Sequence, residues 1–232
     1  MHRSHVPVQE WFWAAYLVAT HTPGISALQL QRQLGIGNYR AAWHLLHRLR
    51  RGMINEERTR LSGLIEADET HIGGPAKGKT GRGVAAAKHK TLVAGAVEVL
   101  TYKDDDGRPR ERAGRIRLQA IQDAGEENIG TFIQRHIEPG SRIRTDGWRG
   151  YSDTALAGYK HSVRIVGIPE RAHQRAPHIH RVFSNLKTWL LGTHHGVSHQ
   201  HLPAYLNEFV FRFNRRFYPM TAFNSALGLA AH

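Results

Sequence analysis

The order of strand-like and helix-like segments after Leu61 restricts the fold more than any other feature of the sequence. Segments of strand character come first, three in succession, and helix and strand then alternate. The predicted strands cover residues 63–68, 91–98, 115–121, 141–145 and 161–166, and the predicted helices cover 126–137, 151–157, 180–191 and 201–217. Asp104-Asp105-Asp106-Gly107 predicts a hairpin turn between the second and third strands. This order predicts an α/β domain with a mixed sheet flanked by helices.

The segment before this domain predicts three short helices, over residues 8–19, 26–34 and 38–51. Ser26 is expected to cap the second helix, and Gly35-Ile36-Gly37 to form the turn before the third. A glycine turn followed by a basic helix is typical of a helix-turn-helix, and an ordinary helical hairpin with a basic solvent face is the alternative. We therefore predict a small all-helical helix-turn-helix segment over residues 1–56 and an α/β domain over 57–232. The candidate DNA contacts on the third helix are Arg40, His44, Arg48 and Arg51.

The excess of basic residues points to a polyanionic partner. Lys and Arg total 32 against 19 Asp and Glu, a net charge of +13 with His neutral, and nucleic acid is the first candidate. Binding to a membrane surface would need a basic amphipathic helix or a lipidation signal, and residues 1–5 offer neither. The apolar residues 11–19 are too few to span a bilayer and the chain has no Cys, so we expect a cytoplasmic protein without a membrane partner. A basic run among glycines is either a further DNA contact or a solvated loop, and its candidates are Lys77, Lys79 and Arg82.

Two acidic residues follow strands that are far apart in the sequence. Asp68 ends the first predicted strand, where Glu66 shares its face, and Asp146 follows the strand at 141–145. Carboxylates at strand ends are suited to bind the hard divalent cations that catalyse phosphoryl transfer, although a turn or a helix cap is the alternative role. His180 and Lys187 lie seven positions apart on a predicted helix, so they share a face and could meet a metal and a phosphate. We interpret Trp148 and Trp189 as core or rim packing rather than as base-stacking platforms.

Five blocks in order resemble the prokaryotic insertion-sequence transposases that carry a DDE-type, ribonuclease-H-like domain. The resemblance runs from about Leu61 to the end of the chain. The blocks are residues 65–74, 145–151, 180–191, 192–197 and 205–216. The resemblance implies three strands, a helix, a strand, a helix and a strand, then further helices. It also implies two Mg²⁺ or Mn²⁺ ions that serve DNA cleavage and strand transfer at the ends of an insertion sequence.

Carried onto this sequence, the resemblance gives Asp68 and Asp146 the first two acidic positions. The usual third residue, a Glu seven positions before a basic residue, falls at His180, and Asn185 and the more distant Glu208 are rivals for that role. The predicted catalytic residues are thus Asp68, Asp146, His180, Asn185 and Lys187, with Asp68, Asp146 and His180 as metal ligands.

The resemblance also implies partners and one departure from the family. The implied partner is double-stranded DNA, both the element ends and the target, in a nucleoid-associated prokaryotic protein. Two DNA ends must be brought together, so a homodimer or higher oligomer is expected. Members of this group commonly begin with a cysteine zinc ribbon, whereas this sequence has no Cys and starts at the helices. The alternatives to a transposase are a non-catalytic DNA-binding regulator and a ribonuclease-H-like nuclease without strand transfer.

Overall fold

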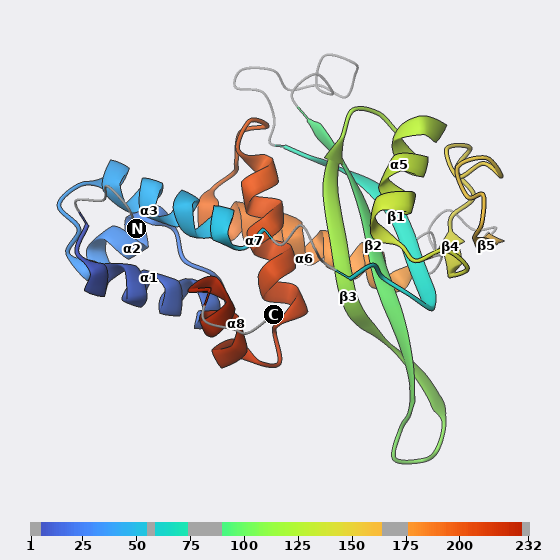
Figure 1. Cartoon of the computed structure of the whole chain (residues 1–232), viewed down its shortest axis with the longest axis horizontal. Helices are drawn as coiled ribbons and strands as arrows, with labels where there is room; N and C mark the ends of the chain where they lie inside the picture. Colours follow the sequence, from blue (N-terminus) through green and yellow to red (C-terminus); the bar gives the residue numbers. More distant parts are fainter. Residues whose placement is uncertain (1–5, 55–58, 74–89, 164–175, 229–232) are drawn as a thin grey trace. The chain divides into compact units, whose positions relative to one another are not determined.

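The computed structural model describes residues 6–54, 59–73, 90–163 and 176–228, and Figure 1 traces the chain. The chain forms two compact units. One comprises residues 1–57, 188–197 and 201–232, and the other residues 58–187 with 198–200. None of the helices in the described ranges is long and apolar enough to cross a membrane. The division into functional domains at residue 56 stays a prediction, because compactness does not report function.

The first unit is helical. Its helices are α1 (Val8–Thr20), α2 (Ala27–Leu34), α3 (Tyr39–Gly52), α7 (Leu202–Asn214) and α8 (Pro219–Ala226), together with the last turns of α6 (Pro177–His194). The predicted punctuation between α2 and α3 is confirmed: the Ser26 side chain accepts the Gln29 N–H at 3.1 Å, and Gly35 ends α2 with a left-handed φ of 65°. Asn38 caps α3 by accepting the Ala41 N–H at 2.8 Å. One apolar core joins the N-terminal helices to Phe211 and Ala222 from the C-terminal ones.

The second unit is built on an open, five-stranded mixed sheet in the order β3-β2-β1-β4-β5. The strands are β1 (Leu64–Ile72), β2 (Thr91–Lys103), β3 (Pro109–Ile121), β4 (Arg142–Thr145) and β5 (Lys160–Val163). β1, β2 and β3 pair in antiparallel fashion, whereas β4 lies parallel to both β1 and β5. This α/β arrangement agrees with the predicted ribonuclease-H-like fold class. The Asp104–Gly107 hairpin turn is also confirmed, with Gly107 at a φ of 76°.

Helices pack on both faces of this sheet (Figure 1). α5 (Glu126–His136) covers one face with Ile129, Phe132 and Ile133, which pack against Ala94 and Ala96. Gly95 points to the opposite face, where α6 lies so close that a Cβ on this glycine would come within 2.7 Å of the Phe183 ring. Gly95 therefore permits α6 to pack directly on β2.

The predicted helix over residues 151–157 is wrong. The segment forms turns, with a single α-helical hydrogen bond, from the Leu156 N–H to the Ser152 carbonyl. Gly158 follows at once with a left-handed φ of 89°, and the Tyr159 hydroxyl donates to the Ile137 carbonyl at 3.0 Å. The chain thus turns back into β5 before a second helical turn can form.

Candidate active site

The register of two parallel strands brings Asp68 and Asp146 to neighbouring positions. Glu66 of β1 pairs with Arg144 of β4, so two further residues along each strand lead to Asp68 and Asp146. The carboxyl ends of parallel strands meet at one edge of a sheet, and both side chains lie at that edge. The acidic pair expected from the sequence is therefore assembled, although Asp68 lies within β1 rather than at its end, because β1 continues to Ile72.

Both carboxylates are oriented by backbone N–H groups. Asp68 Oδ1 accepts the Glu69 N–H at 2.8 Å, and Asp146 Oδ1 accepts the Trp148 N–H at 3.0 Å. Burial raises the pKa of Asp68, and the negative charge of Asp146 raises it further against the opposing effects of the Glu69 N–H, His180 and Lys187. Asp68 thus lies in a partly desolvated position where a second carboxylate makes ionisation costly.

α6 carries a basic pair to the same place. The Nδ1 atom of His180 lies 3.5 Å from Asp68 Oδ2, and the His180 side chain is 36% exposed. Lys187 follows two helical turns later on the same face of α6. Partial burial and Lys90 lower the pKa of Lys187, while Asp68 opposes that shift, so the Lys187 ammonium and the Asp68 carboxylate interact.

Asn185 and Glu208 are the other two candidates for the third metal ligand. Asn185 is exposed and follows His180 by five residues, which at 3.6 residues per turn places it about 140° around α6. Glu208 belongs to the first unit, where its carboxylate lies 2.7 Å from Arg50 Nε and both side chains are 1% exposed. The geometry therefore joins His180 to Asp68, while Asn185 lies on another face of α6 and the Glu208 carboxylate is occupied by Arg50.

A comparison with protein families shows to which family the chain belongs. Residues 60–214, more than half of the chain, match the model of the ISXO2-like transposase domain. The chain belongs to this transposase family. No curated protein matches the chain.

One acidic residue of this transposase domain escaped the sequence analysis. Glu69 follows Asp68 in β1, so its side chain lies on the opposite face of the sheet, beside the buried Tyr151. Burial raises the pKa of Glu69 to about 7, and Asp68 and Asp146 contribute to the rise against the hydrogen bond with Tyr151. The sequence feature that could have identified Glu69 is its position next to Asp68. Because side chains alternate along a strand, that position gave no reason to place both residues at one site.

A second polar cluster of the transposase domain holds the start of α6. Ligand atoms of Glu66, Glu111 and His178 lie within 4.8 Å of one another. Arg144 lies between the two carboxylates, at 3.1 Å from Glu66 and 3.2 Å from Glu111. The other Glu66 oxygen accepts the N–H groups of His178 and Ile179. Because a guanidinium already neutralises these carboxylates, we interpret the cluster as an ion-pair network that fixes the first turn of α6.

The predicted DNA-contacting residues of α3 share one exposed face. Arg40, His44, Arg48 and Arg51 are all exposed, while Ala42, Leu45, Leu46 and Leu49 are buried in the core of the first unit. The spacing of four, four and three residues keeps the basic residues on one side of the transposase's third helix. Lys77, Lys79 and Arg82 lie outside the described residues.

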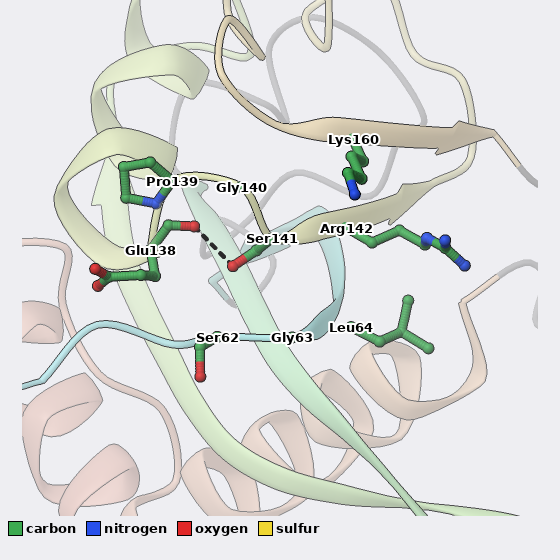
Figure 2. Close-up of a pocket in the computed structure, with 9 residues that line it drawn as sticks. All are labelled: Ser62, Gly63, Leu64, Glu138, Pro139, Gly140, Ser141, Arg142 and Lys160. Atoms are coloured by element: carbon green, nitrogen blue, oxygen red, sulfur yellow. Dashed lines mark hydrogen bonds between the residues drawn. The ribbon is translucent and has the colours of Figure 1, made fainter.

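A hollow of about 470 Å³ lies at the opposite edge of the sheet, where β1, β4 and β5 begin (Figure 2). It is lined by Ser62, Gly63, Leu64, Glu138, Pro139, Gly140, Ser141, Arg142 and Lys160. None of the predicted catalytic residues is among them. The hollow is thus separate from the carboxylate site of the transposase domain.

Proposed function

We propose that the protein is a transposase that cuts DNA at the ends of an insertion sequence and joins the freed ends to target DNA in a metal-dependent reaction. One observation carries the proposal. Within a transposase family domain, the strand register makes Asp68 and Asp146 neighbours, and α6 adds His180 and Lys187. This residue set suits phosphoryl transfer, in which catalysis depends on positioning and on stabilising negative charge.

The donor set fits a divalent cation. Asp68 and Asp146 supply oxygen atoms and His180 a ring nitrogen. Burial, with a smaller contribution from Asp146, raises the pKa of Asp68, and a bound cation would stabilise the ionised carboxylate in that desolvated position. We propose that these three residues hold Mg²⁺ or Mn²⁺, with two ions expected. When bound, the ions would supply Lewis-acid activation of the attacking hydroxyl and stabilisation of the leaving oxygen.

Side chains of this protein bind the reacting phosphate and orient the Asp68 carboxylate. Lys187 projects from the same face of α6 as His180 and binds a non-bridging oxygen of the reacting phosphate. His180 contacts Asp68 and orients its carboxylate. Water first hydrolyses the phosphodiester at the element end, and the resulting 3′-hydroxyl then attacks a phosphodiester of the target. Both reactions use one site because attacking and leaving oxygens exchange roles.

DNA recognition is assigned to the first unit. The exposed basic face of α3, with Arg40, His44, Arg48 and Arg51, suits the major groove or the phosphates beside it. Since two element ends react together, the active form is a homodimer or a higher oligomer on DNA. The same face favours a second candidate function, a DNA-binding regulator without catalysis.

Strand transfer on the flanking inverted repeats tests these proposals. Wild-type protein with Mg²⁺ or Mn²⁺ should join donor ends to a target plasmid and leave a short target duplication. Asp68→Asn and Asp146→Asn should abolish nicking and joining while DNA binding persists, and Asp105→Asn at the exposed hairpin tip should behave as wild type. Nicking that survives Asp68→Asn would overturn the site. Binding without nicking by the wild type would favour the regulator, and cleavage without joining a simple nuclease.

A further inference from the structure

Trp148 is the exposed aromatic residue beside the carboxylate site. Its side chain is 48% exposed, whereas Trp189, for which packing was also expected, is 8% exposed and buried as predicted. Trp148 follows Asp146 by two residues, and its backbone N–H donates to Asp146 Oδ1 at 3.0 Å. A large apolar ring is thus held in solvent at the edge where Asp68 and Asp146 lie.

The Trp148 ring is fixed in place rather than left free. Its Nε1–H donates to the Ala124 carbonyl at 3.0 Å, in the connection between β3 and α5. A Cβ at Gly150 would lie 3.1 Å from the Cδ1 and Nε1 atoms of the ring, so the edge of the indole rests on this glycine. The strand directions place the end of β3 at the same edge of the sheet as the ends of β1 and β4. The indole is therefore anchored along one edge at the active-site end of the sheet.

Arg149 covers the ring only loosely. Its Cζ atom lies 6.0 Å from the Trp148 ring centroid, against 3.9 Å for Arg50 over Tyr205 and 4.1 Å for Arg216 over Phe213. A stacked guanidinium lies closer than this, so a small outward movement of Arg149 would open the ring face to another planar group. The guanidinium is exposed, so it places a positive charge at the surface beside the Trp148 ring.

We propose that Trp148 is a stacking platform for an unpaired DNA base beside the scissile phosphate, with Arg149 contacting the phosphate of that nucleotide. The proposal rests on the proposed function, since the DNA strand must reach Asp68 and Asp146. A base in an intact duplex is covered on both faces by its neighbours, so the base that stacks on Trp148 is one that has left the helical stack. An anchored aromatic ring accepts such a base without regard to its sequence.

Binding of Trp148 variants to DNA probes with and without the base tests the proposal. The probe is a duplex of the element's terminal inverted repeat, intact or abasic on both sides of the scissile phosphate, bound in Ca²⁺ to suppress cleavage. Trp148→Ala should weaken binding of the intact probe about 10-fold and binding of the abasic probe by less than about 2-fold, as expected for loss of one stacked base. Trp148→Phe, which keeps a ring, should retain most of the affinity. Trp13→Ala, at a tryptophan that is 50% exposed in the first unit, should bind both probes with equal losses or none.

Two results would overturn the stacking role. Equal losses on the two probes would mean that Trp148 supports Asp146 or the fold, and unchanged binding of both would make the residue ordinary rim packing. Nicking in Mg²⁺ is measured separately on the intact probe. If the wild type binds but does not nick, the proposed function fails while the probe comparison still decides the stacking role. If the wild type binds neither probe, both proposals fall.

Discussion

The carboxylate of Glu66 accepts the backbone N–H of His178 at 2.8 Å and joins the first half of β1 to the first turn of α6. The same oxygen accepts the Ile179 N–H at 3.1 Å, and the second oxygen pairs with Arg144. Two residues farther along both elements, Asp68 and His180 come within 3.5 Å of each other. The buried cap and the candidate metal site are therefore consecutive contacts of one strand and one helix, so the first contact determines the geometry of the second.

Replacing Glu66 should weaken the fold and the site together. Glu66 is fully buried, so Glu66→Ala leaves the first N–H groups of α6 without an acceptor and Arg144 with Glu111 as its remaining carboxylate partner, and we expect a loss of about 3 kcal/mol in the free energy of unfolding. Glu66→Gln keeps an acceptor oxygen but not the charge and should lose less. Glu111→Gln, which touches Arg144 from a 37% exposed position, should cost less than about 1 kcal/mol. Urea unfolding measures all three, and a Glu66→Ala loss no larger than that of Glu111→Gln would contradict the capping role.

The proposal that His180 is the third metal ligand predicts a contrast between two residues of α6. His180→Ala should lower the rate of DNA nicking at least about 100-fold, because the proposed ligand beside Asp68 is lost. Asn185→Ala should stay near wild type, since Asn185 is exposed and turned away from that face. His180→Glu should retain activity and raise the ratio of Mg²⁺- to Mn²⁺-supported nicking, because magnesium prefers oxygen ligands. Equal damage by Asn185→Ala and His180→Ala would reverse this assignment.

The sequence alone was sufficient to predict features that depend on nearby residues. Ser26 and Gly35 mark the ends of α2 because caps depend on a few adjacent residues. The sequence predicted Asp68 and Asp146 as neighbours because it placed both at strand ends, and the parallel register of β1 and β4 brings them together although β1 continues to Ile72. The common face of His180 and Lys187 follows from two helical turns. These inferences need only the direction in which a side chain points.

Tertiary contacts account for what the sequence could not predict. Arg50 lies in the basic segment 38–51, for which a DNA-contacting or a solvent-exposed face was predicted, yet Arg50 is buried against Glu208, 158 residues away. Glu69 was missed because alternation turns it from Asp68, and only the packing of Tyr151 shows that it is desolvated. The hydrogen bond from the His178 N–H to Glu66 likewise joins residues that are 112 positions apart in the sequence. Partners so distant in sequence leave no periodic signal.

Replacing one member of the buried Arg50–Glu208 pair should lower the free energy of unfolding more than replacing both. Both side chains are 1% exposed, and the guanidinium of Arg50 also lies 3.9 Å over the Tyr205 ring. Glu208→Ala leaves a buried cation without its partner, and we expect a loss of about 3 to 5 kcal/mol in the free energy of unfolding. The double variant Arg50→Met, Glu208→Leu should recover most of this loss because the buried cation is removed together with its partner. Arg212, 3.9 Å from Glu208, keeps the His21 and Thr22 carbonyls as acceptors. Thermal unfolding compares the two, and a double variant as unstable as Glu208→Ala would show that the pair itself is required.

Two partly buried histidines in the first unit predict that the protein loses stability in mild acid. Burial, followed by Arg50, lowers the pKa of His47 to about 4 and that of His194 to about 3. His201 and His44 also face His47, and Arg212, His195 and His47 face His194. Because the unfolded chain takes up these protons near pH 6.5 and the folded chain does not, stability is fully present above pH 6.5 and falls as the pH drops toward 4.

His194 alone should steepen this fall by up to about 1.4 kcal/mol per pH unit. The slope of unfolding free energy between pH 6.5 and 4.5 should therefore be shallower in His194→Gln than in wild type, even if the variant is less stable at pH 7.5. Gln33→Ala, at an exposed non-titrating position of α2, should keep the wild-type slope. Chemical unfolding at several pH values measures the three slopes. Identical slopes in His194→Gln and wild type would mean that His194 takes up its proton equally well in the folded chain.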